Sequence, residues 1–230
     1  IPVDLIAIQF HYANWAGNPD DELIPEMKRK SVVERVKKVA EFCETKNVML
    51  FASYIYYCHM ENFYWNKPGA IRQTYEDLKS CGLNVIIPSP GDEILINDKE
   101  SFNTLSAKNE KNINYWENLL AEKHAVELTS VVDISELAEA YNRFHHRLSA
   151  RNKLSKYLET SLSDFHLKIN LIDKDKVIKL WLFENRMEIE NGSDPDSSVS
   201  MTCDALLRAL SSDYGLGSVT ISSRISFNYI

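Results

Sequence analysis

The sequence has no long apolar run, no excess of basic residues and little glycine or proline. Its apolar stretches, such as residues 83–88, are far shorter than the ~20 residues that a helix needs to cross a bilayer, which excludes a membrane span. The formal net charge is −7, whereas a nucleic-acid-binding domain normally carries a basic surface. Seven glycines and seven prolines in 230 residues also exclude a collagen-like or linker-dominated chain.

Closely spaced cysteine pairs are also missing. The four cysteines, Cys43, Cys58, Cys81 and Cys203, form no CxxC motif, which argues against a zinc ribbon. Three of them have apolar or helical surroundings. We therefore predict buried free thiols in a reducing compartment, and we expect a cytoplasmic protein. Hydrophobic residues at 44% and charged residues at 26% are typical of a folded globular chain.

The N-terminal part of the sequence has the pattern of a parallel α/β sheet. Residues 3–9 and 48–54 are short and apolar, as in buried strands, and residues 22–46 between them have helical spacing of valines on one face. A helical crossover between two buried strands normally joins parallel neighbours.

The next segment continues this pattern. An aromatic loop over residues 55–68 precedes a helix predicted over 70–80, which Gly82 ends. A third strand follows over 83–88, then a turn at Ser89-Pro90-Gly91-Asp92 and a brief strand over 93–97.

The second half has a different character. The sequence is polar from Asp98 to Lys111, and helices are predicted over 112–123 and 134–160. Alternating apolar residues predict a hairpin of strands 165–172 and 177–183, which an acidic polar stretch over 188–200 follows. A helix is predicted over 202–211, with Thr202 as its N-cap. A turn at 214–217 and a last strand over 218–227 complete the predictions.

These patterns predict an α/β region followed by an α+β region. We expect three parts: an α/β part over residues 1–98, a helical connector over 99–162, and a small antiparallel α+β module over 163–230.

No complete catalytic signature is found: HxHxDH, HExxH, GxSxG, Walker and GxGxxG motifs are all missing. Candidate site residues instead gather in the loops after the first two strands, because sites form at the carboxyl ends of parallel strands. His59 and Glu61 are the candidate acid–base residues. The candidate substrate-binding residues are His11, Tyr12, Asn14, Trp15, Asn62 and Tyr64. An ordered first loop, and an aromatic mini-core or subunit interface in the second, stay open as alternatives.

Three segments resemble a known family. The stretches DLIAIQFHYANW, VMLFASYIYYCHMENFY and NVIIPSPGDEI are similar to the closing half of metallo-β-lactamase-fold hydrolases, nearest to the branch that contains CMP-N-acetylneuraminate hydroxylase and lactonase-like proteins. The ending YGLGSVTISSRI is similar to that of the same branch, and looks loosely like a sterol-carrier-type module.

The resemblance implies an αββα sandwich that holds zinc or iron, with a metal-bound hydroxide as the reactive group. The family's HxHxDH motif is not in this chain, and residues 51–53 read Phe-Ala-Ser where its final histidine ligand stands. We therefore expect this chain, which begins with Ile1, to be a processed chain or part of a longer protein, and to be metal-free and inactive alone.

The candidate residues and the resemblance together point to two functions. The first is the C-terminal portion of a metal-dependent hydrolase, with loops that face a small polar substrate and with a missing N-terminal half or a sister subunit as its partner. The alternative is a non-catalytic ligand-binding or oligomerisation module.

Overall fold

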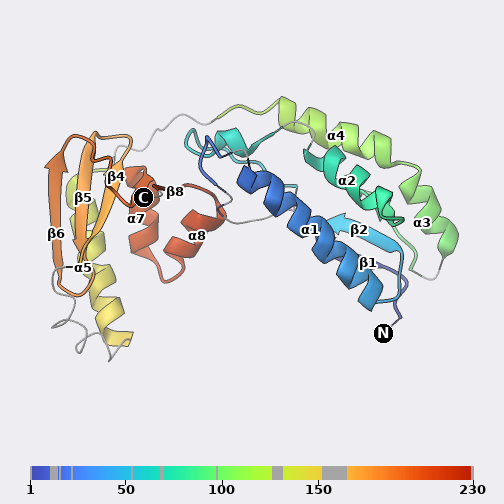
Figure 1. Ribbon diagram of the computed structural model, residues 1–230, viewed down its shortest axis with the longest axis horizontal. Coiled ribbons are helices and arrows are strands. Elements are labelled where there is room, and N and C mark those ends of the chain that lie inside the picture. The colour runs from blue at the N-terminus through green and yellow to red at the C-terminus, as the bar shows by residue number, and fades with distance from the viewer. Residues whose placement is uncertain are drawn as a thin grey trace. The chain divides into compact units, whose positions relative to one another are not determined.

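The structure is a computed structural model (Figure 1). The residues it describes are 2–10, 15, 17–21, 23–52, 54–67, 70–96, 98–125, 132–151 and 165–228. The chain divides into two compact units. Unit 1 consists of Ile1–Ala16, Asp20–Cys58 and Phe63–Ala125, and unit 2 of Gly17–Pro19, His59–Asn62 and Val126–Ile230. The boundary after Ala125 divides the predicted connector between the two units.

Unit 1 contains the predicted parallel sheet. Its strands are β1 (Ile6–Gln9), β2 (Asn47–Phe51) and β3 (Asn84–Ile86), in the order β1-β2-β3 with both pairings parallel. The crossover helices are α1 (Leu23–Phe42) and α2 (Ala70–Ser80). The mixed α/β class and the strand–helix–strand order predicted for this region are therefore confirmed.

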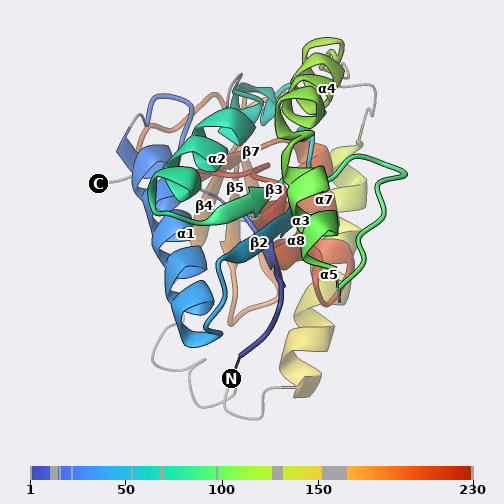
Figure 2. The ribbon, with the colours of Figure 1, turned by 90° about the vertical axis from the view of Figure 1, so that its right-hand side faces the viewer.

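Alternate residues of the strands face different helices, as the two-residue period of a strand requires. Val48 of β2 belongs to the core cluster that α1 and α2 cover. Ile86 of β3 packs instead with Phe102 of α3 (Lys99–Ser106), and Met49 joins them. Figure 2 shows α1 and α2 on one side of β2 and β3, with α3 on the other.

Helix α4 (Asn109–Ala121) closes the edge of the sheet at β3. The carboxamide of Asn109 accepts a hydrogen bond from the Ile87 N–H at 2.8 Å and donates one to the Val85 carbonyl at 2.6 Å. Asn112 donates to the Ile87 carbonyl at 2.7 Å. The open backbone groups of this edge are thus paired by asparagine side chains, which protects the edge from pairing with another chain.

The prediction of a strand over 93–97 is wrong. No strand forms over the described residues 93–96, and Asn97 lies outside the described residues. The polar stretch that follows forms α3 and the beginning of α4. Asp98 caps α3 by accepting from the Glu100 N–H at 2.9 Å, a local signal that favours a helix over a loop.

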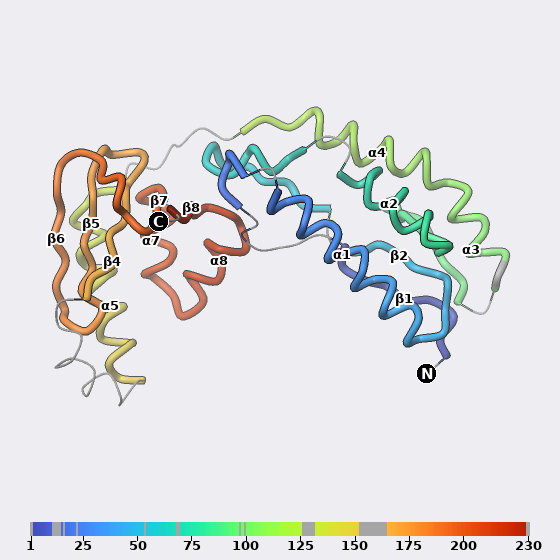
Figure 3. The backbone as a smooth tube through the Cα atoms, in the orientation of Figure 1, coloured from blue at the N-terminus to red at the C-terminus, as the bar shows by residue number. Residues whose placement is uncertain are grey.

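Unit 2 is built on a mixed five-stranded sheet. Its strands are β4 (Leu167–Leu171), β5 (Lys176–Trp181), β6 (Arg186–Asn191), β7 (Val199–Met201) and β8 (Ser226–Phe227), in the order β6-β5-β4-β7-β8. Its helices are α5 (Ile134–Arg151), α7 (Cys203–Ser211) and α8 (Gly215–Ile221). Figure 3 traces the β4–β5–β6 meander.

The predicted hairpin is confirmed by the antiparallel pairing of β4 with β5. The prediction of an all-antiparallel sheet is wrong, because the chain crosses back after β6 and places β7 parallel to β4. The acidic polar stretch over 188–200 supplies part of β6 and all but the last residue of β7. The predicted long helix is confirmed over the described residues as α5, and residues 152–160 lie outside the described residues.

The predictions for residues 202–227 are correct only in part. Thr202 is the N-cap of α7, as predicted, and accepts from the Ala205 N–H at 3.2 Å. The predicted turn at 214–217 is wrong, since α8 occupies Gly215–Ile221, and the strand predicted over 218–227 forms only at its end, as β8. A Cβ at Gly215 would lie 2.1 Å from the Arg208 carbonyl oxygen, so this glycine permits close packing of α8 on α7 rather than a turn.

The cysteines follow the prediction only in part. All four are free thiols, and Cys203 is buried, but Cys81 is exposed, which corrects the expectation that all are buried. Within the described ranges, no helix combines the length and apolar character needed to cross a membrane.

Because Asn109 pairs two buried backbone groups of unit 1, its loss leaves both without a partner. We predict that Asn109→Ala lowers the free energy of unfolding of unit 1 by about 2 kcal/mol. The exposed Asn103→Ala in α3 is the matched control, with an effect below about 0.5 kcal/mol. Amide hydrogen exchange of β2 and β3 measures both, and equal effects of the two substitutions would contradict the edge-pairing role.

Candidate functional site

A cavity of about 520 Å³ opens in unit 1, at the carboxyl edge of its parallel sheet. Phe10 enters it directly after β1, and Tyr54 enters it shortly after β2. The first turns of α1 and α2 and the last turns of α4 complete its walls. This edge of a parallel sheet is where ligand sites commonly form. We call this cavity the aromatic pocket.

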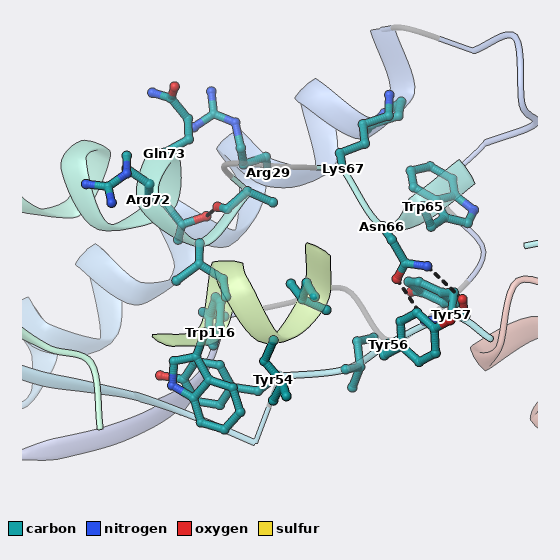
Figure 4. Close-up of a pocket in the computed structure, with 18 of the residues that line it drawn as sticks. Arg29, Tyr54, Tyr56, Tyr57, Trp65, Asn66, Lys67, Arg72, Gln73 and Trp116 are labelled. Carbon is teal, nitrogen blue, oxygen red and sulfur yellow. Dashed lines mark hydrogen bonds between the residues drawn. The ribbon is translucent and has the colours of Figure 1, made fainter. Parts of the chain in front are cut away.

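Aromatic rings make up much of its wall. Tyr54 stacks on Trp116 of α4, with ring centroids 4.2 Å apart and planes 12° from parallel, and Phe10 meets Tyr54 edge-on at 5.2 Å. Figure 4 shows the Tyr54 and Trp116 rings side by side. The other aromatic lining residues are Tyr56, Tyr57 and Trp65.

Three polar atoms of this wall are bonded to backbone carbonyls of unit 1. The Tyr54 hydroxyl donates to the Leu50 carbonyl at 3.0 Å, and the Trp116 indole N–H donates to the Pro88 carbonyl at 2.8 Å. The Tyr56 hydroxyl donates to the His124 carbonyl. Burial raises the pKa of Tyr54 far above its usual value, so this phenol stays protonated. The wall therefore presents ring faces more than hydrogen-bonding groups.

The loop between β2 and α2 is shaped by one asparagine. Asn66 accepts from the Tyr57 N–H at 2.9 Å and donates to the Tyr57 carbonyl at 2.7 Å, as the dashed lines in Figure 4 mark. A short 3-10 helix, Phe63–Trp65, precedes it. Tyr57 and Trp65 are buried together, and Ile55 and Tyr64 pack against them.

Four cationic side chains and one carboxylate line the pocket: Arg29, Lys67, Arg72, Lys123 and Glu26. The two arginines hold ion pairs. Arg29 pairs with Glu26 at 2.8 Å and with Asp77, and Arg72 pairs with Glu110 at 2.8 Å and Glu117 at 3.3 Å. The guanidinium groups are thereby neutralised by the protein.

The predicted acid–base residues His59 and Glu61, and the predicted substrate-binding residue Asn62, do not line the aromatic pocket. His59, Glu61 and Asn62 belong to unit 2, where Glu61 forms a buried ion pair with Arg224 at 2.7 Å. The two side chains are only 5% and 3% exposed. Thr202 donates to the same Glu61 oxygen at 3.2 Å, and Asp204 takes a second ion pair with Arg224 at 2.7 Å. We call these four residues the Arg224 cluster.

His59 and Asn62 surround this cluster with hydrogen bonds. Asn62 accepts from the His59 N–H at 2.9 Å and donates to the Ser222 carbonyl at 2.7 Å. Burial lowers the pKa of His59 below its usual value, and the Arg224 charge lowers it further. Burial alone raises the pKa of Asp204, but Arg208 and Arg224 outweigh it and hold this pKa low. The imidazole is thus neutral near pH 7, and the Glu61 carboxylate is bound to a fixed cation.

The other predicted site residues are distributed as follows. His11, Tyr12 and Asn14 lie outside the described residues. Trp15 belongs to unit 1 and is half-buried, but it does not line the aromatic pocket. Tyr64 packs on Trp65 with ring centroids 5.1 Å apart, and burial raises its pKa to about 12. Their roles as substrate-binding residues stay predictions.

The implied metal can be tested against the side chains. In the part of the chain that the structure describes, no three histidine, cysteine, aspartate or glutamate side chains gather to hold an ion. The Glu61 carboxylate next to His59 is bound to Arg224. These residues therefore do not fit a zinc or iron centre.

Comparison of the chain with models of protein families, with curated proteins and with solved structures finds no match. The aromatic pocket and the Arg224 cluster are therefore interpreted from their own chemistry.

Sequence reasoning missed several pocket residues. The aromatic loop after β2 was recognised, and its residues Tyr56, Tyr57, Trp65 and Asn66 line the pocket. Trp116 and Lys123 were missed, because they lie in and after a helix that the sequence assigned to a connector. The apolar side chains of this helix, Ile113, Trp116 and Leu120 among them, were the available signal.

Glu61 is tied to Arg224 across a buried ion pair, so removing either charge leaves the other unpaired. We predict that Glu61→Gln or Arg224→Met lowers the free energy of unfolding of unit 2 by about 3 kcal/mol. The matched control is Glu188→Gln, which breaks the exposed pair with Arg186 and changes stability by less than about 1 kcal/mol. Hydrogen exchange of β4 and β5 measures the effect. Unchanged protection in both cluster variants would contradict a structural role for the pair.

Proposed function

We propose that unit 1 binds a small molecule with a flat or apolar body in the aromatic pocket. The observation that carries this proposal is the cavity itself, about 520 Å³ at the carboxyl edge of a parallel sheet, with stacked aromatic walls. Ligand sites have this size, this position and this kind of wall.

The chemical groups of the pocket walls indicate what kind of ligand body fits. The Tyr54, Tyr56 and Trp116 polar atoms are bonded to backbone carbonyls, so they cannot also donate to a ligand without losing those bonds. Ring faces stack on planar groups and bury apolar surface. A planar or apolar molecule is therefore recognised better than a wholly polar one.

Pocket residues come from elements whose positions are fixed by the sheet. Phe10 and Tyr54 follow neighbouring parallel strands, and Trp116 is held to the Pro88 carbonyl after β3. Asn66 fixes the loop between β2 and α2 through its paired bonds with Tyr57. The pocket is thus largely formed before a ligand arrives, which reduces the conformational entropy lost on binding.

Filling the pocket tests this proposal. Ala70 lines the pocket at the beginning of α2, so Ala70→Trp places an indole in the cavity. We predict that the fluorescent apolar probe N-phenyl-1-naphthylamine binds the unaltered protein, and that this substitution weakens binding at least about tenfold. The control Ala138→Trp adds the same side chain at an exposed position of α5 in unit 2 and leaves binding unchanged. Absence of probe binding to the unaltered protein contradicts the proposal.

A second candidate is the substrate-side part of a metal-dependent hydrolase with the metallo-β-lactamase sandwich. It is favoured by the parallel β1-α1-β2-α2-β3 order in the region that resembles that family. The exposed apolar side chains Phe51, Leu95 and Ile96 of unit 1 also suit a second half of a sandwich or a sister subunit. The aromatic pocket would then hold the substrate, and the missing half would supply the zinc or iron ligands.

Metal content separates the two candidates. The hydrolase proposal predicts stoichiometric zinc or iron in the protein isolated from its natural source, measured by inductively coupled plasma mass spectrometry. Metal-free protein that still binds N-phenyl-1-naphthylamine would contradict the hydrolase and support a binding module.

A further inference from the structure

We infer that the ligand of the aromatic pocket carries an anionic group, and that Lys67 and Lys123 bind it. This inference rests on the proposed function, because it names the chemical class of the ligand in the same pocket. The class is a planar or apolar body with a carboxylate, sulfonate or phosphate at one end.

The first observation is the charge of the pocket lining. Four of the charged lining residues are basic and one is acidic, whereas the chain as a whole has 33 acidic and 26 basic residues. The pocket therefore reverses the charge balance of the chain. The two arginines are offset by the carboxylates that pair with them, so the lysines are the cations that can raise the local concentration of an anion.

The second observation separates the lysines from the arginines. The arginines are neutralised by Glu26, Asp77, Glu110 and Glu117. Neither Lys67 nor Lys123 forms an ion pair with any carboxylate of the described residues, although the chain has an excess of acidic side chains. Both ammonium groups are thus available to a ligand.

Both lysines line the same cavity. Lys67 lies in the loop before α2, and Lys123 lies just after α4. Both side chains are exposed, so they stand at the opening of the pocket rather than at its floor. Lys67 Nζ lies 6.0 Å from the centroid of the Trp65 ring, next to the aromatic wall. An amphipathic ligand would place its body against the rings and its charge toward the lysines.

A matched pair of probes tests this arrangement. 8-Anilinonaphthalene-1-sulfonate is N-phenyl-1-naphthylamine with a sulfonate added, so the two differ in the anionic group alone. We expect the sulfonate to bind more tightly at low salt, and Lys67→Gln or Lys123→Gln to weaken it about threefold each. The double variant is expected to weaken it about tenfold, while affinity for the neutral probe changes by less than about twofold.

Two control variants distinguish binding in the pocket from binding elsewhere. Lys38→Gln removes the same charge from an exposed site of α1 outside the pocket, and it is expected to leave both affinities unchanged. Ala70→Trp must weaken both probes, which places them in the pocket. If the neutral probe binds but sulfonate affinity is insensitive to both pocket lysines, the anion inference is overturned and the proposed function stands. If neither probe binds, the proposed function itself fails.

Discussion

Backbone groups at the end of a sheet or in a tight loop need hydrogen-bond partners, and asparagine carboxamides meet this constraint throughout the chain. A carboxamide has the donor and acceptor of a peptide group, so it can pair with backbone as a neighbouring strand does. Asn109 pairs the edge of β3, and Asn66 pairs both backbone groups of Tyr57 beside the pocket. In unit 2, Asn18 pairs likewise with Phe227 of β8, and Asn170 with the backbone of Asp194. The sheet edges and the pocket loop depend on these side chains.

The Arg224 guanidinium imposes a second constraint, because a charge that is 3% exposed must be paired. Glu61 and Asp204 supply the counter-charges, and Glu61 reaches this position from the loop between β2 and α2. That loop therefore has two functions. Its aromatic ends line the pocket of unit 1, and its middle, His59–Asn62, is part of unit 2.

Local patterns were sufficient for much of the fold. The strands and helices of the parallel sheet, the β4–β5 hairpin and the Thr202 cap all follow from periodicity or capping within a few residues. The rest depends on distant partners. Gly215 has the sequence signature of a turn residue, but its packing role depends on the backbone of α7, and the buried ion pair of Glu61 depends on Arg224, 163 residues away. The aromatic loop, which includes Lys67, could be recognised as a site from composition, but Trp116 and Lys123, which complete the pocket, come from a segment without such a signal.

The central claim is that one loop is divided between a ligand pocket and a structural anchor. Amide hydrogen exchange along residues 54–67, with and without N-phenyl-1-naphthylamine, tests it most directly. In the free protein, the hydrogen-bonded amides of His59 and Asn62 should already be protected, and the probe should add protection at Tyr57 and Asn66 while leaving the 59–62 segment unchanged. Rapid exchange throughout the loop in the free protein, or probe-induced protection confined to the 59–62 segment, would contradict this account.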